Sequence, residues 1–185
     1  MPDKHLTEKT LSSETIFKGR LLEVRRDEVQ LPDGTTTIRE YIRHPGAVVM
    51  VPLRDDGRII FLRQFRYALD RVMMELPAGK VDAGEDPAET ARRELAEEIG
   101  ATCQKLVRLG LIHPCIGYSD EQIVVYLAQG LQWAEAEAEA DEFVEPFELP
   151  LEEALELIEQ GKITDVKTII ALYWTERYLA GKWRQ

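Results

Sequence analysis

The chain has 185 residues, enough for one domain of ordinary size with a buried core. Its hydrophobic fraction of 44% and charged fraction of 31% are typical of a soluble globular protein. The formal net charge of −11 argues against the phosphate backbone of a nucleic acid as the general partner.

No stretch approaches the ~18 apolar residues of a membrane span, and the first residues lack the apolar run of a signal peptide. We therefore expect a cytoplasmic protein without a membrane partner. Cys103 and Cys115 have no metal-ligand spacing, which indicates reduced thiols.

The N-terminal region predicts a small β module. Residues 1–12 are polar, and we expect them to be loosely ordered. Two β-rich runs, 21–31 and 35–42, flank the sequence Pro-Asp-Gly at 32–34, which indicates an antiparallel hairpin. A hairpin is weak by itself, so we expect it to pack on the main domain or on a second copy of the chain. These features predict an N-terminal module at 1–43 and a main domain at 44–185.

The main domain shows apolar runs and alternating runs that predict strands. They lie at residues 46–53, 59–62, 106–112, 122–128 and 143–149. The acidic run at 133–142 is expected to be a solvated loop.

The end of the chain predicts two helices. Apolar residues recur at helical period from Leu151 to Ile158, and Gly161 ends that helix. Thr164 or Asp165 caps a final helix. Its expected inner face consists of Val166, Ile169, Ile170, Tyr173 and Trp174. Together with a central helix, these elements predict a mixed α/β sandwich.

The central helix carries a group of acidic residues. Asp86 can cap its start, Pro87 suits the first helical position, and Gly100 ends it. Glu94, Glu97 and Glu98 then fall at i, i+3 and i+4 on one helical face. Like charges at this spacing repel, and hard cations such as Mg²⁺ or Mn²⁺ prefer carboxylate oxygens. The alternative is a solvated acidic face.

Residues 79–101 favour the metal site. They read GKVDAGEDPAETARRELAEEIGA and fill every specified position of the Nudix box, G-x5-E-x7-R-E-U-x-E-E-x-G-U, which the segment therefore resembles. The resemblance implies a helix–sheet–helix fold with a mixed sheet. It also implies metal-dependent hydrolysis of a nucleoside diphosphate linked to another group.

The resemblance implies a role for each matching residue. Glu94 and Glu98 are similar to the main metal ligands of the family, and Glu97 to a further ligand or an orienting group. The carbonyl of Ala78 is expected to supply a backbone oxygen to Mg²⁺ or Mn²⁺. Arg93 and Glu85 resemble the supporting pair that holds the glutamates in place.

Several segments outside the box resemble the ADP-ribose pyrophosphatase branch of the family. They are Gly46-Ala47-Val48, Arg63-Gln64-Phe65-Arg66, Glu75-Leu76-Pro77-Ala78, Gly117-Tyr118-Ser119-Asp120-Glu121 and Gly161-Lys162-Ile163-Thr164-Asp165 with Thr168. The branch implies cleavage of ADP-ribose to AMP and ribose 5-phosphate by a homodimer that exchanges its N-terminal strands. This would explain the underpacked hairpin.

Two reactive roles follow from this branch. Arg66 resembles the cation that holds the diphosphate; the alternative is a surface charge at a strand end. Glu121 resembles the loop carboxylate that orients or deprotonates the attacking water, because a mobile loop can bring a base into reach. Glu142 and Glu145 are the competing candidates for the base.

The N-terminal module offers candidates for substrate binding. Phe17 or Tyr41 is expected to stack on adenine, and Arg39 to add a contact from the partner chain. Alternatively, Phe17 and Tyr41 form the core of the hairpin. His44 and His113 have no metal-ligand spacing and are expected to be structural.

Other functions remain open at this point. Within the Nudix hydrolases, GDP-mannose or a dinucleoside polyphosphate could replace ADP-ribose, because the box recognises only the diphosphate. Outside enzymes, a Nudix domain can act as an ADP-ribose sensor. The intact glutamates of the box argue for catalysis.

Overall fold

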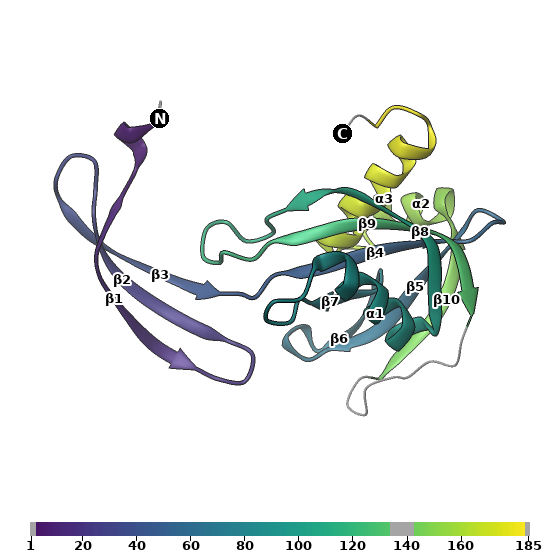
Figure 1. Ribbon diagram of the computed structural model, residues 1–185, viewed down its shortest axis with the longest axis horizontal. Helices are drawn as coiled ribbons and strands as arrows, with labels where there is room; N and C mark the ends of the chain where they lie inside the picture. The colour runs from purple at the N-terminus through teal and green to yellow at the C-terminus, as the bar shows by residue number, and fades with distance from the viewer. Residues whose placement is uncertain (1–2, 134–142, 184–185) are drawn as a thin grey trace. The chain divides into compact units, whose positions relative to one another are not determined.

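A computed structural model of the protein describes residues 3–133 and 143–183 (Figure 1). The chain forms two compact units. The N-terminal unit consists of Met1–Pro45 and Cys115–Gln122, and the main unit consists of Gly46–Pro114 and Ile123–Gln185. Within the described residues, no helix combines the length and the apolar character needed to cross a membrane.

The N-terminal unit contains an antiparallel sheet of three strands in the order β1-β2-β3. A short 3-10 helix, η1, precedes the sheet. The elements are η1 (Lys4–Leu6), β1 (Lys9–Lys18), β2 (Glu23–Gln30) and β3 (Thr36–Arg43). The expected hairpin corresponds to β2 and β3, whose residues pair from Gln30 and Thr36 to Glu23 and Arg43.

The expectation that residues 9–12 are loosely ordered was wrong. Lys9 pairs with Gln30, and Thr10 pairs with Val29, at the start of β1. The polar side chains suggested a flexible end, but β2 has a second edge whose backbone groups need hydrogen bonds, and β1 supplies them. The Thr and Ser side chains fit a strand that is exposed along its whole length in this chain.

The main unit is built on a mixed sheet, as expected from the sequence. Its strands are β4 (Ala47–Leu53), β5 (Arg58–Arg66), β6 (Arg71–Glu75), β7 (Ala78–Lys80), β8 (Ala101–Ile112), β9 (Ile123–Trp133) and β10 (Val144–Pro150). The main path runs β10-β5-β4-β9-β8, with β6 paired to β5 and β7 paired to β4. Among the described strand pairs of this sheet, only β4–β9 is parallel. A 3-10 helix, η2 (Tyr67–Leu69), joins β5 to β6.

Helices cover both faces of this sheet. Helix α1 (Pro87–Ile99) lies on one face, where Leu95 packs with Val48 and Met50 of β4. Helices α2 (Leu151–Glu159) and α3 (Val166–Leu179) belong to the other hydrophobic cluster, where Leu172 packs with the alternate β4 residues. The alternation of β4 therefore fills two cores, which confirms the expected helix–sheet–helix arrangement (Figure 1).

The expected inner face of α3 was partly wrong. Val166 and Tyr173 are exposed, whereas Thr168, Ala171, Leu172 and Thr175 are buried. A prediction from hydrophobic residues placed the inner face of α3 incorrectly, because two of the residues that are buried on the real inner face are threonines. Trp174 still packs against the core, and its ring lies so close to Gly110 of β8 that a side chain at Gly110 would collide with it.

Thr168 connects α3 to the segment after β6. Asp165 caps α3 by accepting hydrogen bonds from the Thr168 backbone N–H (3.1 Å) and hydroxyl (2.6 Å). The Thr168 hydroxyl oxygen in turn accepts a hydrogen bond from the Leu76 N–H at 2.9 Å. This bond is buried, so the Leu76 N–H depends on α3 for its partner.

We predict that Thr168→Val destabilises the fold by about 1–3 kcal/mol, because it leaves a buried N–H without an acceptor. Thr175→Val is the matched control. Thr175 is equally inaccessible on the same helix, yet its hydroxyl makes no hydrogen bond to any described residue. The control should change stability by under about 0.5 kcal/mol or increase it. Urea unfolding of both variants measures the difference, and equal losses would contradict the role given to Thr168.

Candidate active site

Helix α1 begins and ends where its sequence signals predict. The Asp86 carboxylate accepts a hydrogen bond from the Ala88 N–H at 2.8 Å, and Pro87 occupies the first turn. Gly100 ends the helix with a left-handed φ of 61°. These local contacts fix the register of the acidic face that follows.

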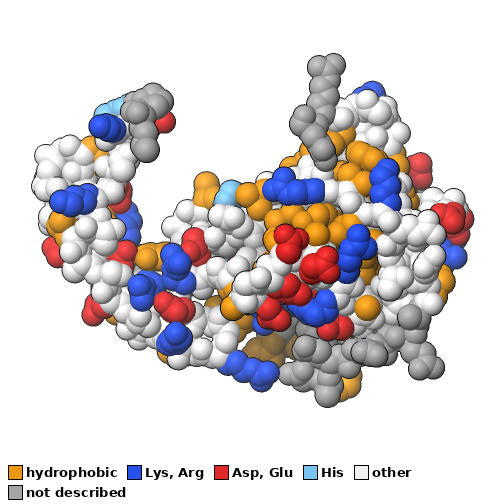
Figure 2. All heavy atoms as spheres, in the orientation of Figure 1, with side chains coloured by type: hydrophobic (Ala, Val, Ile, Leu, Met, Phe, Trp, Pro, Cys, Tyr) orange, Lys and Arg blue, Asp and Glu red, His pale blue; other side chains and the backbone are white. Residues whose placement is uncertain are grey.

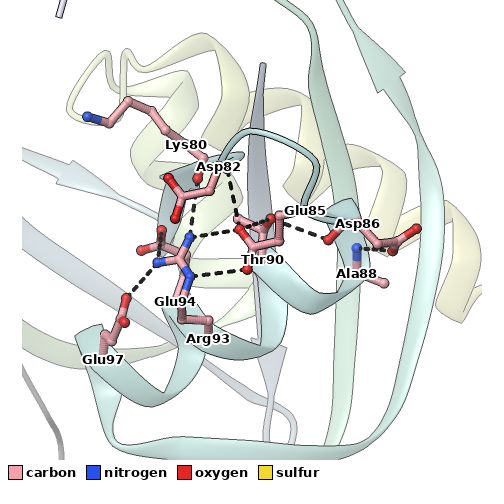
Figure 3. Close-up of polar contacts among 9 residues, drawn as sticks. All are labelled: Lys80, Asp82, Glu85, Asp86, Ala88, Thr90, Arg93, Glu94 and Glu97. Atoms are coloured by element: carbon pink, nitrogen blue, oxygen red, sulfur yellow. Dashed lines mark hydrogen bonds and ion pairs between the residues drawn. The ribbon is translucent and has the colours of Figure 1, made fainter. Parts of the chain in front are cut away.

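Arg93 is the central cation of this face (Figure 3). Its Nη1 donates to Glu94 Oε1 at 2.9 Å and to Glu97 Oε2 at 2.8 Å. Its Nε and Nη2 donate to the two oxygens of Glu85 at 3.3 Å and 3.2 Å, and Nη2 also reaches the Lys80 carbonyl. One guanidinium therefore offsets the repulsion among three carboxylates. The Glu85 hydrogen bond and the charges of Glu94 and Glu97 hold the pKa of Arg93 well above its usual value.

Glu85 ties the loop before α1 to the helix. Hydrogen bonds from Arg93 and then from the Thr90 hydroxyl (2.8 Å) lower the pKa of Glu85 to about 2. The Asp82 N–H also donates to this carboxylate (Figure 3). Glu85 is therefore an anion at neutral pH, and the pairing of Arg93 with Glu85 has the geometry of a supporting pair.

Glu94 and Glu98 are buried beside the segment that precedes the loop. They are only 8% and 7% exposed. Glu98 accepts a hydrogen bond from the Ala78 N–H at 3.0 Å. A methyl group on Gly79 would overlap the Glu94 carboxylate, so this position requires glycine.

These donors fit a hard divalent cation in their chemistry. They are carboxylate oxygens and a backbone segment, which Mg²⁺ and Mn²⁺ prefer, and Gly79 leaves room for the carboxylate of Glu94. Acidic side chains gather over α1 and the loop before it (Figure 2). In the described part of the chain, however, no three acidic, histidine or cysteine side chains converge on one point. Arg93 bridges Glu94 and Glu97, so a cation would share these carboxylates with it.

Arg66 takes part in a buried charge network that the sequence analysis missed. Its Nε and Nη2 donate to Glu75 at 2.6 Å and 2.7 Å. The second Glu75 oxygen also accepts from Lys167 Nζ at 2.5 Å, and Lys167 reaches Asp165 at 2.9 Å. Arg66 therefore has a defined partner, although its side chain is 43% exposed. The sequence feature that could have indicated this network is Glu75, an acidic residue within the otherwise apolar run 72–76.

Glu75 is ionised within this network although it is only 4% exposed. Burial raises its pKa, but the hydrogen bonds and charges of Arg66 and Lys167 outweigh burial and bring the pKa to about 2. Removing Arg66 or Lys167 would therefore destabilise the fold, because part of the buried negative charge of Glu75 would no longer be compensated.

Glu121 lies in the N-terminal unit, whereas the glutamates of α1 lie in the main unit. Its side chain is 24% exposed, and Oε1 lies 3.7 Å from His44 Nε2. The neighbouring Asp120 accepts from the His44 N–H at 2.8 Å, and the Ile42 N–H donates to the Tyr118 carbonyl at 2.9 Å. The loop at 115–122 is thus attached to the end of β3.

The competing candidates for the base differ in their surroundings. Glu145 of β10 has a side chain that is 71% exposed, 3.6 Å from Arg63. Glu142 lies outside the described residues. A partly enclosed carboxylate such as Glu121 has fewer conformations to lose when it takes up a reactive position.

The three N-terminal candidates do not share one surface. Arg39 and Tyr41 lie on one face of the sheet, because both belong to β3 and are separated by one residue. Phe17 pairs with Val24, which places it on the opposite face from the Arg25–Tyr41 pair.

These candidates also differ in their contacts. The Tyr41 hydroxyl donates to Asp27 at 3.2 Å, and Arg39 pairs with Glu8 at 2.6 Å. Phe17 is 55% exposed, so in this single chain it is not part of a hairpin core.

Comparison with known proteins agrees with this geometry. Residues 43–171 match the NUDIX domain, and residues 8–42 match the nucleoside diphosphate sugar hydrolase N-terminal domain. An ADP-ribose pyrophosphatase from Bacillus subtilis is 42% identical over 175 residues, which cover 94% of this chain and 95% of that protein. A methanol dehydrogenase activator from Bacillus methanolicus has the same identity and coverage.

A solved structure extends the similarity to the fold. The crystal structure of an ADP compounds hydrolase superposes with a TM-score of 0.87 at 25% sequence identity, covering 97% of this chain and 98% of the other. The N-terminal sheet is therefore included in the similarity. With its complete box, its match to the NUDIX domain and this fold, the chain belongs to the Nudix hydrolase family.

Proposed function

We propose that the chain hydrolyses the diphosphate bond of ADP-ribose and releases AMP and ribose 5-phosphate. The observation that carries this proposal is the 42% identity, over 94% of the chain, to a protein named ADP-ribose pyrophosphatase. The match of residues 8–42 to a nucleoside diphosphate sugar hydrolase domain favours a sugar nucleotide over a dinucleoside polyphosphate. The GDP-mannose pyrophosphatases among the relatives are more distant from this chain.

Glu94, Glu98 and the Ala78 carbonyl are the proposed ligands of Mg²⁺ or Mn²⁺, and Glu97 is a further ligand or an orienting group. Their support is the burial of Glu94 and Glu98 beside the Ala78–Gly79 segment. A divalent cation held there would neutralise the negative charge of the diphosphate, which otherwise repels a nucleophile. Arg93 and Glu85 hold the carboxylates in place through the hydrogen bonds described above.

Arg66 and Glu121 are the proposed groups that act on the substrate. Arg66 binds a diphosphate oxygen, because its guanidinium is partly exposed and charged. Glu121 accepts the proton of the water whose oxygen forms a bond to one phosphorus. The bond from that phosphorus to the bridging oxygen breaks, and its electron pair stays on the bridging oxygen, which leaves with the other phosphate. Tyr41 or Phe17 stacks on adenine, and Arg39 contributes from the partner chain.

The proposal includes a homodimer that exchanges its N-terminal strands. In the single chain, several large apolar side chains of the N-terminal unit are exposed. They are Leu11, Ile16, Phe17, Leu21, Leu22 and Ile38. Such an apolar surface is typical of an interface. Sedimentation of the whole chain should give twice the monomer mass, and a monomer at micromolar concentration would reject the exchange.

A second candidate function is activation of a methanol dehydrogenase. It is favoured by the relative that carries this name, which is as similar to the chain as the ADP-ribose pyrophosphatase. The rate of a purified methanol dehydrogenase with and without the chain tests this function separately from hydrolysis of ADP-ribose.

The substrate panel is the experiment that decides the main proposal. ADP-ribose, GDP-mannose, NADH and diadenosine polyphosphates are incubated with the chain, with and without Mg²⁺, and the products are identified by mass. We expect metal-dependent AMP and ribose 5-phosphate from ADP-ribose, well above the other reactions. A faster reaction with another member of the panel would reject the substrate but not the chemistry. Binding of ADP-ribose without turnover would indicate a sensor.

We predict that Glu98→Gln keeps the fold and lowers kcat at least roughly 100-fold, because a neutral amide holds a divalent cation poorly. Glu89→Gln on the exposed side of α1 removes the same charge and is the matched control. Calorimetric titration with Mn²⁺ should show weaker binding only for Glu98→Gln. Full activity of this variant would reject the ligand set.

Glu121→Gln is expected to lower kcat by about 100- to 10,000-fold with a much smaller change in KM, because a general base acts mainly in the transition state. Glu145→Gln provides the comparison, since it tests the competing candidate on β10. Steady-state rates with ADP-ribose measure both variants. A normal rate for Glu121→Gln together with a slow Glu145→Gln would transfer the role to Glu145.

A further inference from the structure

Lys167 of α3 shares the buried carboxylate of Glu75 with Arg66. Glu75 Oε2 lies 2.7 Å from Arg66 Nη2 and 2.5 Å from Lys167 Nζ, while Oε1 accepts only from Arg66 Nε, at 2.6 Å. The two cations therefore meet on one oxygen. The position of Glu75 thus determines both the direction of the Arg66 guanidinium and the position of Lys167.

Arg66 needs such an anchor because its side chain is long and partly exposed. An arginine loses side-chain rotamer freedom when it is held in one conformation. Its Nε and Nη2 are fixed by Glu75, whereas Nη1 makes no hydrogen bond within the described residues. The guanidinium thus has one edge anchored and a third nitrogen available to donate to a phosphate oxygen.

Glu75 in turn depends on α3 for its own position. The Lys167 side chain is only 13% exposed and is also bound to Asp165, the residue that caps α3. Next to it, Thr168 accepts the Leu76 N–H. Two successive residues of the first turn of α3 therefore hold the side chain of Glu75 and the backbone of Leu76.

The charges of this group are balanced. Arg66 and Lys167 carry two positive charges, and Glu75 and Asp165 carry two negative charges. Without Lys167, Arg66 would be the single cation beside Glu75, and the charges of Asp165 and Glu98 also act on it. The guanidinium would then be drawn towards further carboxylates instead of being held by Glu75 alone.

We propose that Lys167 is a positioning residue for the substrate, which orients Arg66 through Glu75 so that Arg66 can bind the diphosphate. This inference rests on the proposed function, because it takes the diphosphate as the ligand of Arg66. A purely structural Lys167, which only joins α3 to β6, would affect stability without any link to the contribution of Arg66 to binding.

A double-mutant cycle tests the link between the two residues. The four proteins are the wild-type chain, Lys167→Met, Arg66→Ala and the double variant. For each one, calorimetry measures the Kd of the non-hydrolysable α,β-methylene ADP-ribose with Mg²⁺, and steady-state kinetics measure KM and kcat for ADP-ribose. Lys162→Met removes the same charge at an exposed position after α2 and is the matched control.

We expect Lys167→Met to raise Kd and KM about tenfold with kcat changed less than about threefold, because an anchor for binding is lost. In the Arg66→Ala background, the same substitution should leave Kd unchanged, since the residue through which Lys167 acts is gone. Lys162→Met should leave all three constants unchanged. If a variant of the cycle does not fold, Lys167→Gln and Arg66→Gln replace Lys167→Met and Arg66→Ala, because each amide can still donate a hydrogen bond to Glu75.

Two results would overturn the inference. One is a tenfold loss that is repeated in the Arg66→Ala background, which would mean that Lys167 acts independently of Arg66. The other is a folded Lys167 variant that binds the analogue with wild-type affinity. A wild-type chain that binds the analogue but does not hydrolyse ADP-ribose rejects the proposed function alone, and the cycle still decides the role of Lys167. A wild-type chain that does not bind the analogue rejects both.

Discussion

Compensation of negative charge is the constraint on which this structure depends. Three glutamates within one turn of α1 repel one another, and two of them are almost completely buried. Arg93 relieves part of this repulsion by contacting Glu94 and Glu97, together with Glu85 of the loop before the helix. The same solution recurs at Glu75, whose buried charge is divided between Arg66 and Lys167. In both places an arginine is held by carboxylates, so its direction is fixed before any ligand arrives.

Side chains of two helices hold one short backbone segment of the main unit. Helix α1 holds the Ala78 N–H through Glu98, and α3 holds the Leu76 N–H through Thr168. These helices belong to the hydrophobic clusters on opposite faces of the sheet. The backbone from Glu75 to Gly79 is therefore held by hydrogen bonds from helices on both faces of the sheet. This is the segment that supplies the proposed metal-binding carbonyl and that carries the anchor of Arg66, so its rigidity serves both proposed tasks.

The sequence predicted best what is local. The cap at Asp86, the proline that follows and the glycine end of α1 were predicted from residues that contact one another within a turn. The spacing of the glutamates depended only on the helix period. By contrast, β1 was missed because its polar residues gain their order from β2, and the face of α3 was misplaced because buried threonines look like surface residues.

The sequence by itself determined the family, the mixed α/β architecture and the position of the acidic helix. Hydrophobic periodicity, helix caps and the spacing of the motif all depend on residues that are close together in the sequence. Only the tertiary structure showed that Lys167 and Thr168 reach Glu75 and Leu76, 92 residues earlier in the chain in each case. Only it showed that Phe17 and Tyr41 lie on opposite faces of the N-terminal sheet. Such contacts depend on strand register and on helix packing across the sheet, and a single sequence carries no local signal for either.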